Sequence, residues 1–225
     1  MIQISSRGSI YFFVTLGLII MYNYLIVGHL LKEKGRLIYE PGREVNTEAF
    51  ANSKIVQFIF RVIGAAMESR FRYRFFGPKQ ILRGAHIHPG QTILEVGCGT
   101  GFFTLSAAQF IGDQGCLVAM DVLPASIEAV SKKAQTANLK NVRVVKGDAM
   151  NTMLAAESMD AVLLFGVIPA PMLPLNRLLP EMHRILKPGG TMAVWPPSWI
   201  RQSILRSGLF TYACKRNGVF NFRRS

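Results

Sequence analysis

The chain has 225 residues, a formal net charge of +13 and a hydrophobic fraction of 50%. This length gives one globular domain of ordinary size together with an attachment. The three cysteines are too few and too scattered for a disulfide framework, which fits a reducing compartment. Neither they nor the four histidines show metal-ligand spacing, so we expect no metal site.

The first predicted element is a run of 22 residues without a formal charge, Ile10 to Leu31. As a helix it would be about 33 Å long, which is enough to cross a bilayer. We therefore expect a short tail over residues 1–8 and a transmembrane helix over residues 9–31. A cleaved signal peptide and a buried core helix are the alternatives. Because lysines and arginines follow the run, the positive-inside rule predicts a single-pass membrane protein whose remaining chain is cytoplasmic.

Residues 32–74 are expected to form a linker and an amphipathic cap helix, the helical part over residues 47–67. The apolar stripe of that helix is wide enough to lie in the membrane interface or to pack on the core. Residues 84–195 hold eight basic and eight acidic residues, so the positive excess lies on the flanks. There it alternates with aromatic residues, as in residues 70–76, which favours contact with anionic lipid headgroups. Nucleic-acid binding and a merely solvated helix face are the alternatives.

A glycine-rich loop follows a short apolar run that ends on Glu95. It reads Gly97-Cys98-Gly99-Thr100-Gly101, and glycines at every second position bring bare backbone against a ligand. A helix is expected to open at Phe103, with N-terminal amides available to a carboxylate. The spacing differs from the dinucleotide pattern G-x-G-x-x-G, because Phe102 occupies the place of the third glycine. We interpret Cys98 as a small filler of this loop, with a nucleophilic role as the alternative.

Two further predicted strands lead to carboxylates. Residues 116–121 end on Asp121, twenty residues after Gly101, where an acid at the end of a second strand accepts hydrogen bonds from ribose hydroxyls. Residues 142–146 lead to Asp148. The unbroken apolar run of residues 160–166 is typical of a buried parallel strand.

The C-terminal part completes an alternation of helices and strands. A helix is expected over residues 124–137, and another after Leu173 with a kink or a late start at Pro180. Residues 184–195 predict a helix end, a Pro-Gly-Gly turn and a strand. A last helix over residues 200–207 and a pair of strands end the chain.

In their order, the glycine loop and the four pieces after it resemble the class I S-adenosylmethionine (SAM) dependent methyltransferases, type 11 and quinone-biosynthesis-like, over residues 75–225. The resemblance implies an α/β fold with a Rossmann-like, doubly wound, seven-stranded sheet, and SAM as cofactor. It assigns Glu95 to the methionine amino group, Asp121 to the ribose and Asp148 to the adenine amino group. The residues that it implies for cofactor binding are Glu95, Gly97, Cys98, Gly99, Gly101, Asp121, Val122, Asp148, Ala149 and Phe165.

The resemblance further implies an enzyme that moves the methyl group of SAM by in-line displacement. The membrane-proximal cap leads us to expect a lipophilic acceptor, a quinone precursor or a lipid. The sequence identifies no catalytic residue and no general base. A methyltransferase of a protein or small soluble substrate, anchored for location only, and a catalytically silent SAM-fold scaffold are the alternatives. A nicotinamide-dependent oxidoreductase is disfavoured by the glycine spacing.

Overall fold

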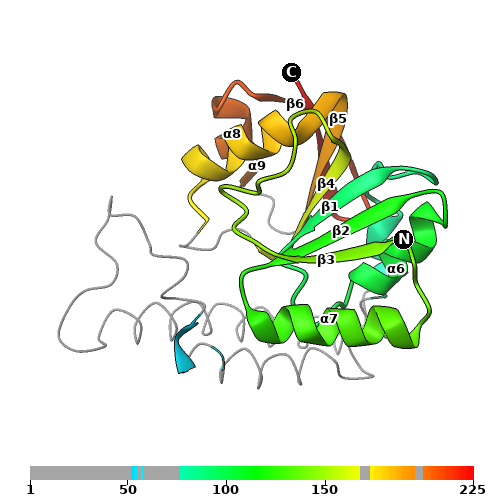
Figure 1. Cartoon of the computed structure of the whole chain (residues 1–225). Helices are drawn as coiled ribbons and strands as arrows, with labels where there is room; N and C mark the ends of the chain where they lie inside the picture. Colours follow the sequence, from blue (N-terminus) through cyan, green and yellow to red (C-terminus); the bar gives the residue numbers. More distant parts are fainter. Residues whose placement is uncertain (1–51, 55–56, 58–76, 168–172, 196–199) are drawn as a thin grey trace, which may run out of the picture. The chain divides into compact units, whose positions relative to one another are not determined.

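The computed structural model describes residues 52–54, 57, 77–167, 173–195 and 200–225. Helices and strands alternate along this part of the chain (Figure 1). In order, the elements are α5 (Pro78–Leu82), β1 (Thr92–Val96), α6 (Thr104–Ile111), β2 (Cys116–Asp121), α7 (Pro124–Thr136), β3 (Val142–Lys146), β4 (Met159–Phe165), α8 (Leu175–Ile185), β5 (Leu186–Trp195), α9 (Ile200–Arg206), β6 (Phe210–Arg216) and β7 (Val219–Arg224).

The strands form one seven-stranded sheet in the order β3-β2-β1-β4-β5-β7-β6. Strands β1 to β5 pair in parallel, and β7 lies antiparallel to both β5 and β6. The order reverses next to β1, which is the topological switch point where open α/β sheets bind ligands at the carboxyl ends of their strands. The expected seven-stranded, Rossmann-like α/β sheet is therefore confirmed.

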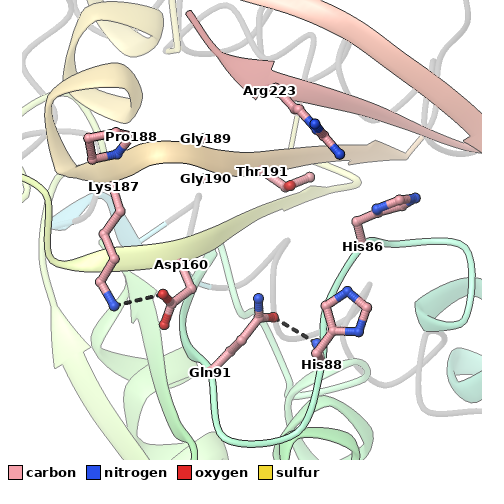
Figure 2. A pocket seen from close by; sticks show the side chains of 10 residues that line it. All are labelled: His86, His88, Gln91, Asp160, Lys187, Pro188, Gly189, Gly190, Thr191 and Arg223. Carbon is pink, nitrogen blue, oxygen red and sulfur yellow. Dashed lines mark hydrogen bonds and ion pairs between the residues drawn. The ribbon is translucent and has the colours of Figure 1, made fainter.

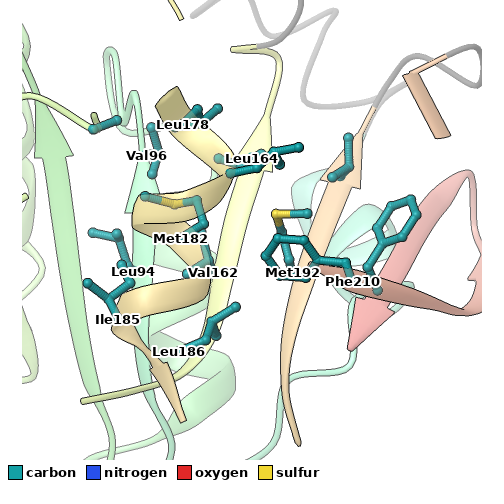
Figure 3. Close-up of a cluster of buried hydrophobic side chains, with 14 of the residues drawn as sticks. Leu94, Val96, Val162, Leu164, Leu178, Met182, Ile185, Leu186, Met192 and Phe210 are labelled. Atoms are coloured by element: carbon teal, nitrogen blue, oxygen red, sulfur yellow. The ribbon is translucent and has the colours of Figure 1, made fainter. Parts of the chain in front are cut away.

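Helices cover both faces of the sheet, because the central strands are apolar on both sides. On β4, Val162 and Leu164 pack on the face of α8 and α9, whereas Leu163 and Phe165 pack on the face of α5 and α6. Figure 3 shows the first of these cores, where side chains of α8 meet those of β1, β4 and β5. The helix labels in Figure 1 mark α6 and α7 on one side of the sheet and α8 and α9 on the other.

Two helices begin at a proline, and a third helix contains a proline in its interior. Pro78 and Pro124 stand in the first turns of α5 and α7, where the missing N–H costs no intrahelical bond. Pro180 lies inside α8, which begins at Leu175. A late start at Pro180 was thus the wrong expectation, since four buried apolar residues (Leu178, Leu179, Met182 and Ile185) hold the helix on the sheet on both sides of the proline.

The Pro-Gly-Gly segment differs from its expected form. The sequence predicts a turn that precedes the strand, whereas β5 already begins at Leu186, which pairs with Met159. The next pair joins Ala161 to Thr191, so four residues of β5 bulge opposite the single residue Asp160. The ladder therefore continues on both sides of the turn instead of starting after it.

Several expected features lie outside the described residues: the transmembrane helix over 9–31, the cap helix over 47–67 with most of its residues, and the basic and aromatic run over 70–76. Within the part of the chain that the structure describes, no helix is both long and apolar enough to cross a membrane.

Candidate cofactor site

The glycine loop lies at the carboxyl end of β1 and is tied to the neighbouring strand. The backbone N–H groups of Gly97 and Cys98 donate to the carbonyl oxygen of Met120, at 2.8 and 3.1 Å. From the other side, Lys133 Nζ of α7 donates to the Thr100 carbonyl at 2.7 Å. The loop is thus held by β2 and α7 before any ligand arrives.

Two of the loop glycines meet different surroundings. Gly97 has a φ of +67°, and a Cβ built on it would lie 2.3 Å from Cγ1 of Val167. Gly99 has a φ of +53°, and a Cβ there would meet no atom within 4 Å. Gly97 therefore serves close packing within the fold, while Gly99 leaves open space beside bare backbone, as a ligand cradle requires.

Asp121, at the end of β2, is buried and bound by backbone amides. Its Oδ2 accepts from Gly99 N and its Oδ1 from Leu123 N, both at 2.9 Å. Burial raises the pKa of this carboxyl, and the hydrogen bonds from Leu123 and Gly99 oppose that rise. The Ser126 side chain and the Val122 backbone also donate to this carboxylate, so Asp121 ties the glycine loop to the turn after β2.

Glu95 lies inside the sheet end with only 2% of its surface exposed. Its Oε2 accepts from the Thr104 hydroxyl at 2.6 Å, at the first residue of α6. Burial and, to a smaller extent, the nearby Asp121 carboxylate raise the pKa of Glu95 to about 8, against the lowering effect of the Thr104 hydrogen bond. The carboxyl is thus mostly protonated at neutral pH, and a cation bound beside it would favour its ionised form.

The other acid of the pattern lies after β3. Asp148 Oδ1 accepts from Met150 N at 2.8 Å, which forms a local turn, and the Asn151 backbone N–H donates to the Asp148 carbonyl. Ala149 is buried next to it, and Val122 is half-buried after β2. The three acids therefore lie at the carboxyl edge of neighbouring strands. Glu95 is near the end of β1, Asp121 ends β2, and Asp148 follows β3.

Two apolar members of the predicted set are buried. Phe165 ends β4 and packs edge to face on Phe103, with ring centroids 5.0 Å apart. Cys98 is 5% exposed, and burial together with the Glu95 and Asp121 carboxylates raises the pKa of its thiol. A raised pKa leaves Cys98 as a thiol rather than a thiolate, so its surroundings favour the filler over the nucleophile.

Sequence reasoning missed two residues of this site, Thr104 and Lys133. Thr104 binds Glu95 from nine positions away, and Lys133 reaches the loop from the last turn of α7. Neither belongs to a local motif. Only their positions could have indicated them. Thr104 is the first residue of the helix after the loop, and Lys133 lies on the helix that follows Asp121.

The residues fit the SAM molecule by chemistry. Carboxylates suit its ribose hydroxyls and its ammonium, the open backbone at Gly99 suits close approach, and the carboxyl-end edge is where such a ligand lies in this topology. Residues 168–172 and 196–199, which follow β4 and β5 in the sequence, are outside the described residues.

Comparisons with known proteins agree with the geometry. Residues 93–190 match the family model described as a methyltransferase domain. A demethylmenaquinone methyltransferase of Staphylococcus epidermidis is 34% identical over 113 residues, which cover 50% of this chain and 45% of that protein. A demethylmenaquinone methyltransferase of Geobacillus stearothermophilus is 31% identical over 121 residues, 53% of this chain and 51% of that protein. The chain thus spans about half the length of the curated relatives it matches.

Solved structures share the fold at lower identity. A SAM-dependent methyltransferase from Aquifex aeolicus has a TM-score of 0.62 and 22% identity, covering 72% of this chain and 96% of the other. The [4+2]-cyclase SpnF has a TM-score of 0.54 and 20% identity, covering 73% of this chain and 61% of the other. These likenesses establish the methyltransferase fold. The domain that the family model describes covers residues 93–190 of this chain, within that fold.

Proposed function

We propose that this chain transfers the methyl group of SAM to a lipophilic acceptor, a quinone precursor or a lipid. The observation that carries the proposal is the row of acids along the carboxyl edge of the sheet, with Glu95, Asp121 and Asp148 at or after neighbouring strands and the open Gly99 backbone between them.

Each acid has a role that its surroundings suit. Asp121, which lies at the end of β2 against the Gly99 backbone, accepts from the ribose hydroxyls. Asp148, in its turn after β3, accepts from the adenine amino group. Glu95 faces the methionine ammonium, which would favour the ionised carboxylate at neutral pH.

SAM, when bound, supplies an electrophilic methyl on a sulfonium with a good leaving group. The chain then needs mainly to hold the acceptor in line and keep water away. The buried ring of Phe165, packed on Phe103 at the end of β4, supports an apolar wall beside the methyl position. No dedicated base is required of the site.

The lipophilic acceptor is supported by the names of the relatives, which are demethylmenaquinone methyltransferases. It is also supported by the uncharged run Ile10–Leu31. We propose a tail over 1–8, a membrane helix over 9–31, a linker and cap over 32–74, and the catalytic domain over 75–225 on the cytoplasmic side. The basic flanks would rest on anionic headgroups.

The membrane part has its own test, separate from activity. The full chain should resist carbonate extraction, and deletion of residues 1–31 should release it at moderate salt, which screens the remaining basic flanks. Recovery of the full chain in the soluble fraction would refute the anchor.

The activity is tested with full-length protein in detergent, SAM labelled on its methyl group and extracted membrane lipids. We expect label in the organic phase, and loss of that label with Asp121→Asn. The matched control is Asp113→Asn, since Asp113 is an exposed carboxylate outside the site. Label in protein or in the aqueous phase would favour an enzyme anchored for location only.

The absence of label under all conditions, with SAM still bound, would favour a second candidate, a catalytically silent SAM-fold scaffold. This candidate stays open because the fold alone does not fix the chemistry: the [4+2]-cyclase SpnF shares the fold at a TM-score of 0.54, and its name gives another reaction.

A further inference from the structure

A hollow lies at the amino edge of the sheet, where the parallel strands begin. It has a volume of about 290 Å³. Its wall comes from the connection before β1, the beginnings of β4 and β5, and the end of the antiparallel β7. Because ligands of open α/β sheets bind at the carboxyl ends, this hollow is separate from the cofactor site.

The wall of the hollow is basic. Arg223, Lys187, His86 and His88 border it, and Asp160 is the one carboxylate among its lining residues. Asp160 is already engaged: its Oδ1 accepts from Lys187 Nζ at 2.6 Å, and its Oδ2 accepts from Thr92 N at 2.8 Å. The lysine and the aspartate neutralise each other, so the guanidinium of Arg223 sets the net positive charge.

Arg223 has no hydrogen bond or ion pair through its guanidinium within the residues that the structure describes. It lies directly opposite Thr191 in the antiparallel pair of β5 and β7. Figure 2 shows Arg223, Thr191 and His86 on one side of the hollow, with His88 and Gln91 on another. Gln91 uses its Oε1 to accept from His88 N at 2.7 Å, which leaves its amide N–H groups as donors.

A buried asparagine holds the backbone of this wall, while the side chain of Arg223 is itself exposed. Asn221 of β7 is fully buried, donates to the Gly84 carbonyl at 2.8 Å and accepts from His86 N at 3.0 Å. Asn221 and Arg223 are two residues apart on one strand and so share a face. The same strand therefore clamps the histidine segment and presents the arginine to the hollow.

The electrostatics of His86 agree with an excess of positive charge. Burial lowers the pKa of His86, and Arg216, His88 and Arg223 lower it further. Among the described residues, no group of three or more His, Cys, Asp or Glu side chains is placed to hold a metal ion, so the histidine pair lacks the partners of a metal site.

We propose that this amino-edge hollow binds a phosphate group, held by the guanidinium of Arg223 with Thr191, Gln91 and the His88 imidazole as further donors, while the His86 ring is engaged with Cys214 through Nε2. A tetrahedral oxyanion matches a wall of several converging donors and one unpaired cation, because each oxygen accepts more than one hydrogen bond. The phosphate comes from a small soluble anion or from a lipid headgroup, and the two sources share this chemistry. The site goes beyond methyl transfer and does not depend on it.

The test is calorimetry of the full-length protein with inorganic phosphate, against chloride at equal ionic strength. We expect saturable binding of one phosphate, weakened at least tenfold by Arg223→Gln, as for loss of a hydrogen bond to a charged group. The matched control is Arg206→Gln, which removes the same charge from an exposed position on α9 outside the hollow and should change phosphate affinity less than twofold. Both variants should bind SAM like the unaltered protein, which shows that the fold is intact.

A second titration distinguishes a lipid headgroup from a soluble anion. It uses a short-chain, water-soluble phosphatidic acid, with the matching phosphatidylcholine as control. Tighter binding of the phosphatidic acid than of phosphate, lost with Arg223→Gln alone, supports a lipid headgroup. Equal or weaker binding supports a soluble anion. The proposal is overturned if neither phosphate nor phosphatidic acid binds saturably, or if the two arginine variants weaken binding equally.

Discussion

The two edges of the sheet carry side chains of opposite type, carboxyl groups at one edge and an arginine at the other. At the carboxyl edge, Glu95, Asp121 and Asp148 follow neighbouring parallel strands, whereas at the amino edge Asp160 is neutralised by Lys187 and Arg223 is left unpaired among the described residues. Because the strands are parallel, their carboxyl ends lie together at one edge and their amino ends at the other. One acidic or basic residue at the end of each strand is therefore enough to make an edge acidic or basic. The acidic edge suits a cationic cofactor, and the basic edge suits an anion.

The largest expected effect tests the packing of the acidic edge. Gly97→Ala should lower the free energy of unfolding by about 2–5 kcal/mol, because left-handed strain and overpacking against Val167 add. Gly99→Ala has the strain without the clash, so it should cost about 1–2 kcal/mol. Its new Cβ fills the open cradle, and SAM binding should be lost. Denaturant unfolding gives the stability of both variants, and calorimetry gives their SAM affinity. Equal stability losses would contradict the assignment of Gly97 to packing and of Gly99 to ligand binding.

Asp121→Asn should weaken SAM binding by about 1.5–3 kcal/mol, since a charge-assisted bond to the ligand is lost. Equilibrium dialysis with labelled SAM gives the affinity, and exposed Asp113→Asn is the control. An unchanged affinity in the Asp121 variant would place the ribose elsewhere.

Protonation of Glu95 should couple SAM binding to pH. At pH 6.5 the carboxyl, with its pKa at about 8, is protonated before binding, and a bound ammonium would drive release of close to one proton. Calorimetry in buffers of different ionisation enthalpy counts that proton. Glu95→Gln should abolish the release, and an unchanged release would place the ammonium away from Glu95.

The same pKa predicts an effect on stability without cofactor. Because the pKa of Glu95 rises from 4.5 to about 8 on folding, its favourable contribution is complete below pH 4.5 and is lost as pH rises to about 8. The difference in unfolding free energy between Glu95→Gln and the unaltered protein should therefore shift in favour of the variant across this range.

The smallest expected effect lies at the basic edge. Asp160→Asn removes the ion pair with half-exposed Lys187 but keeps an acceptor for Thr92 N, so the stability loss should be about 0.2–1 kcal/mol. SAM affinity should stay unchanged, whereas phosphate affinity should rise. A large loss of SAM affinity would show that the two edges are coupled.

The strands and the acidic edge were predictable because both depend on local patterns. An apolar run followed by an acid, as at Asp121, indicates a buried strand and the end at which its ligand lies. The bulge at Asp160 was not predictable, because it depends on how β5 registers with β4. Thr104 and Lys133 were missed for the same reason, since their contacts with Glu95 and Thr100 arise only when the helices fold back on the sheet.

The basic edge shows the limit most clearly. His86 and His88 precede β1, while Arg223 stands near the end of the chain, 137 positions after His86. The antiparallel return of β7 brings them to one hollow, and the buried Asn221 fixes that contact. From the sequence alone, the histidines showed no metal-ligand spacing, and Arg223 was one of the basic residues of the C-terminal flank. Neither observation predicted that they would lie together.

The most direct test of the central claim is competitive calorimetry of SAM and NADH on the full-length protein. The acidic edge, with its open Gly99 and its acids at Glu95, Asp121 and Asp148, predicts that SAM binds with one-to-one stoichiometry and that NADH neither binds nor displaces it. Binding of NADH with no binding of SAM would contradict the account.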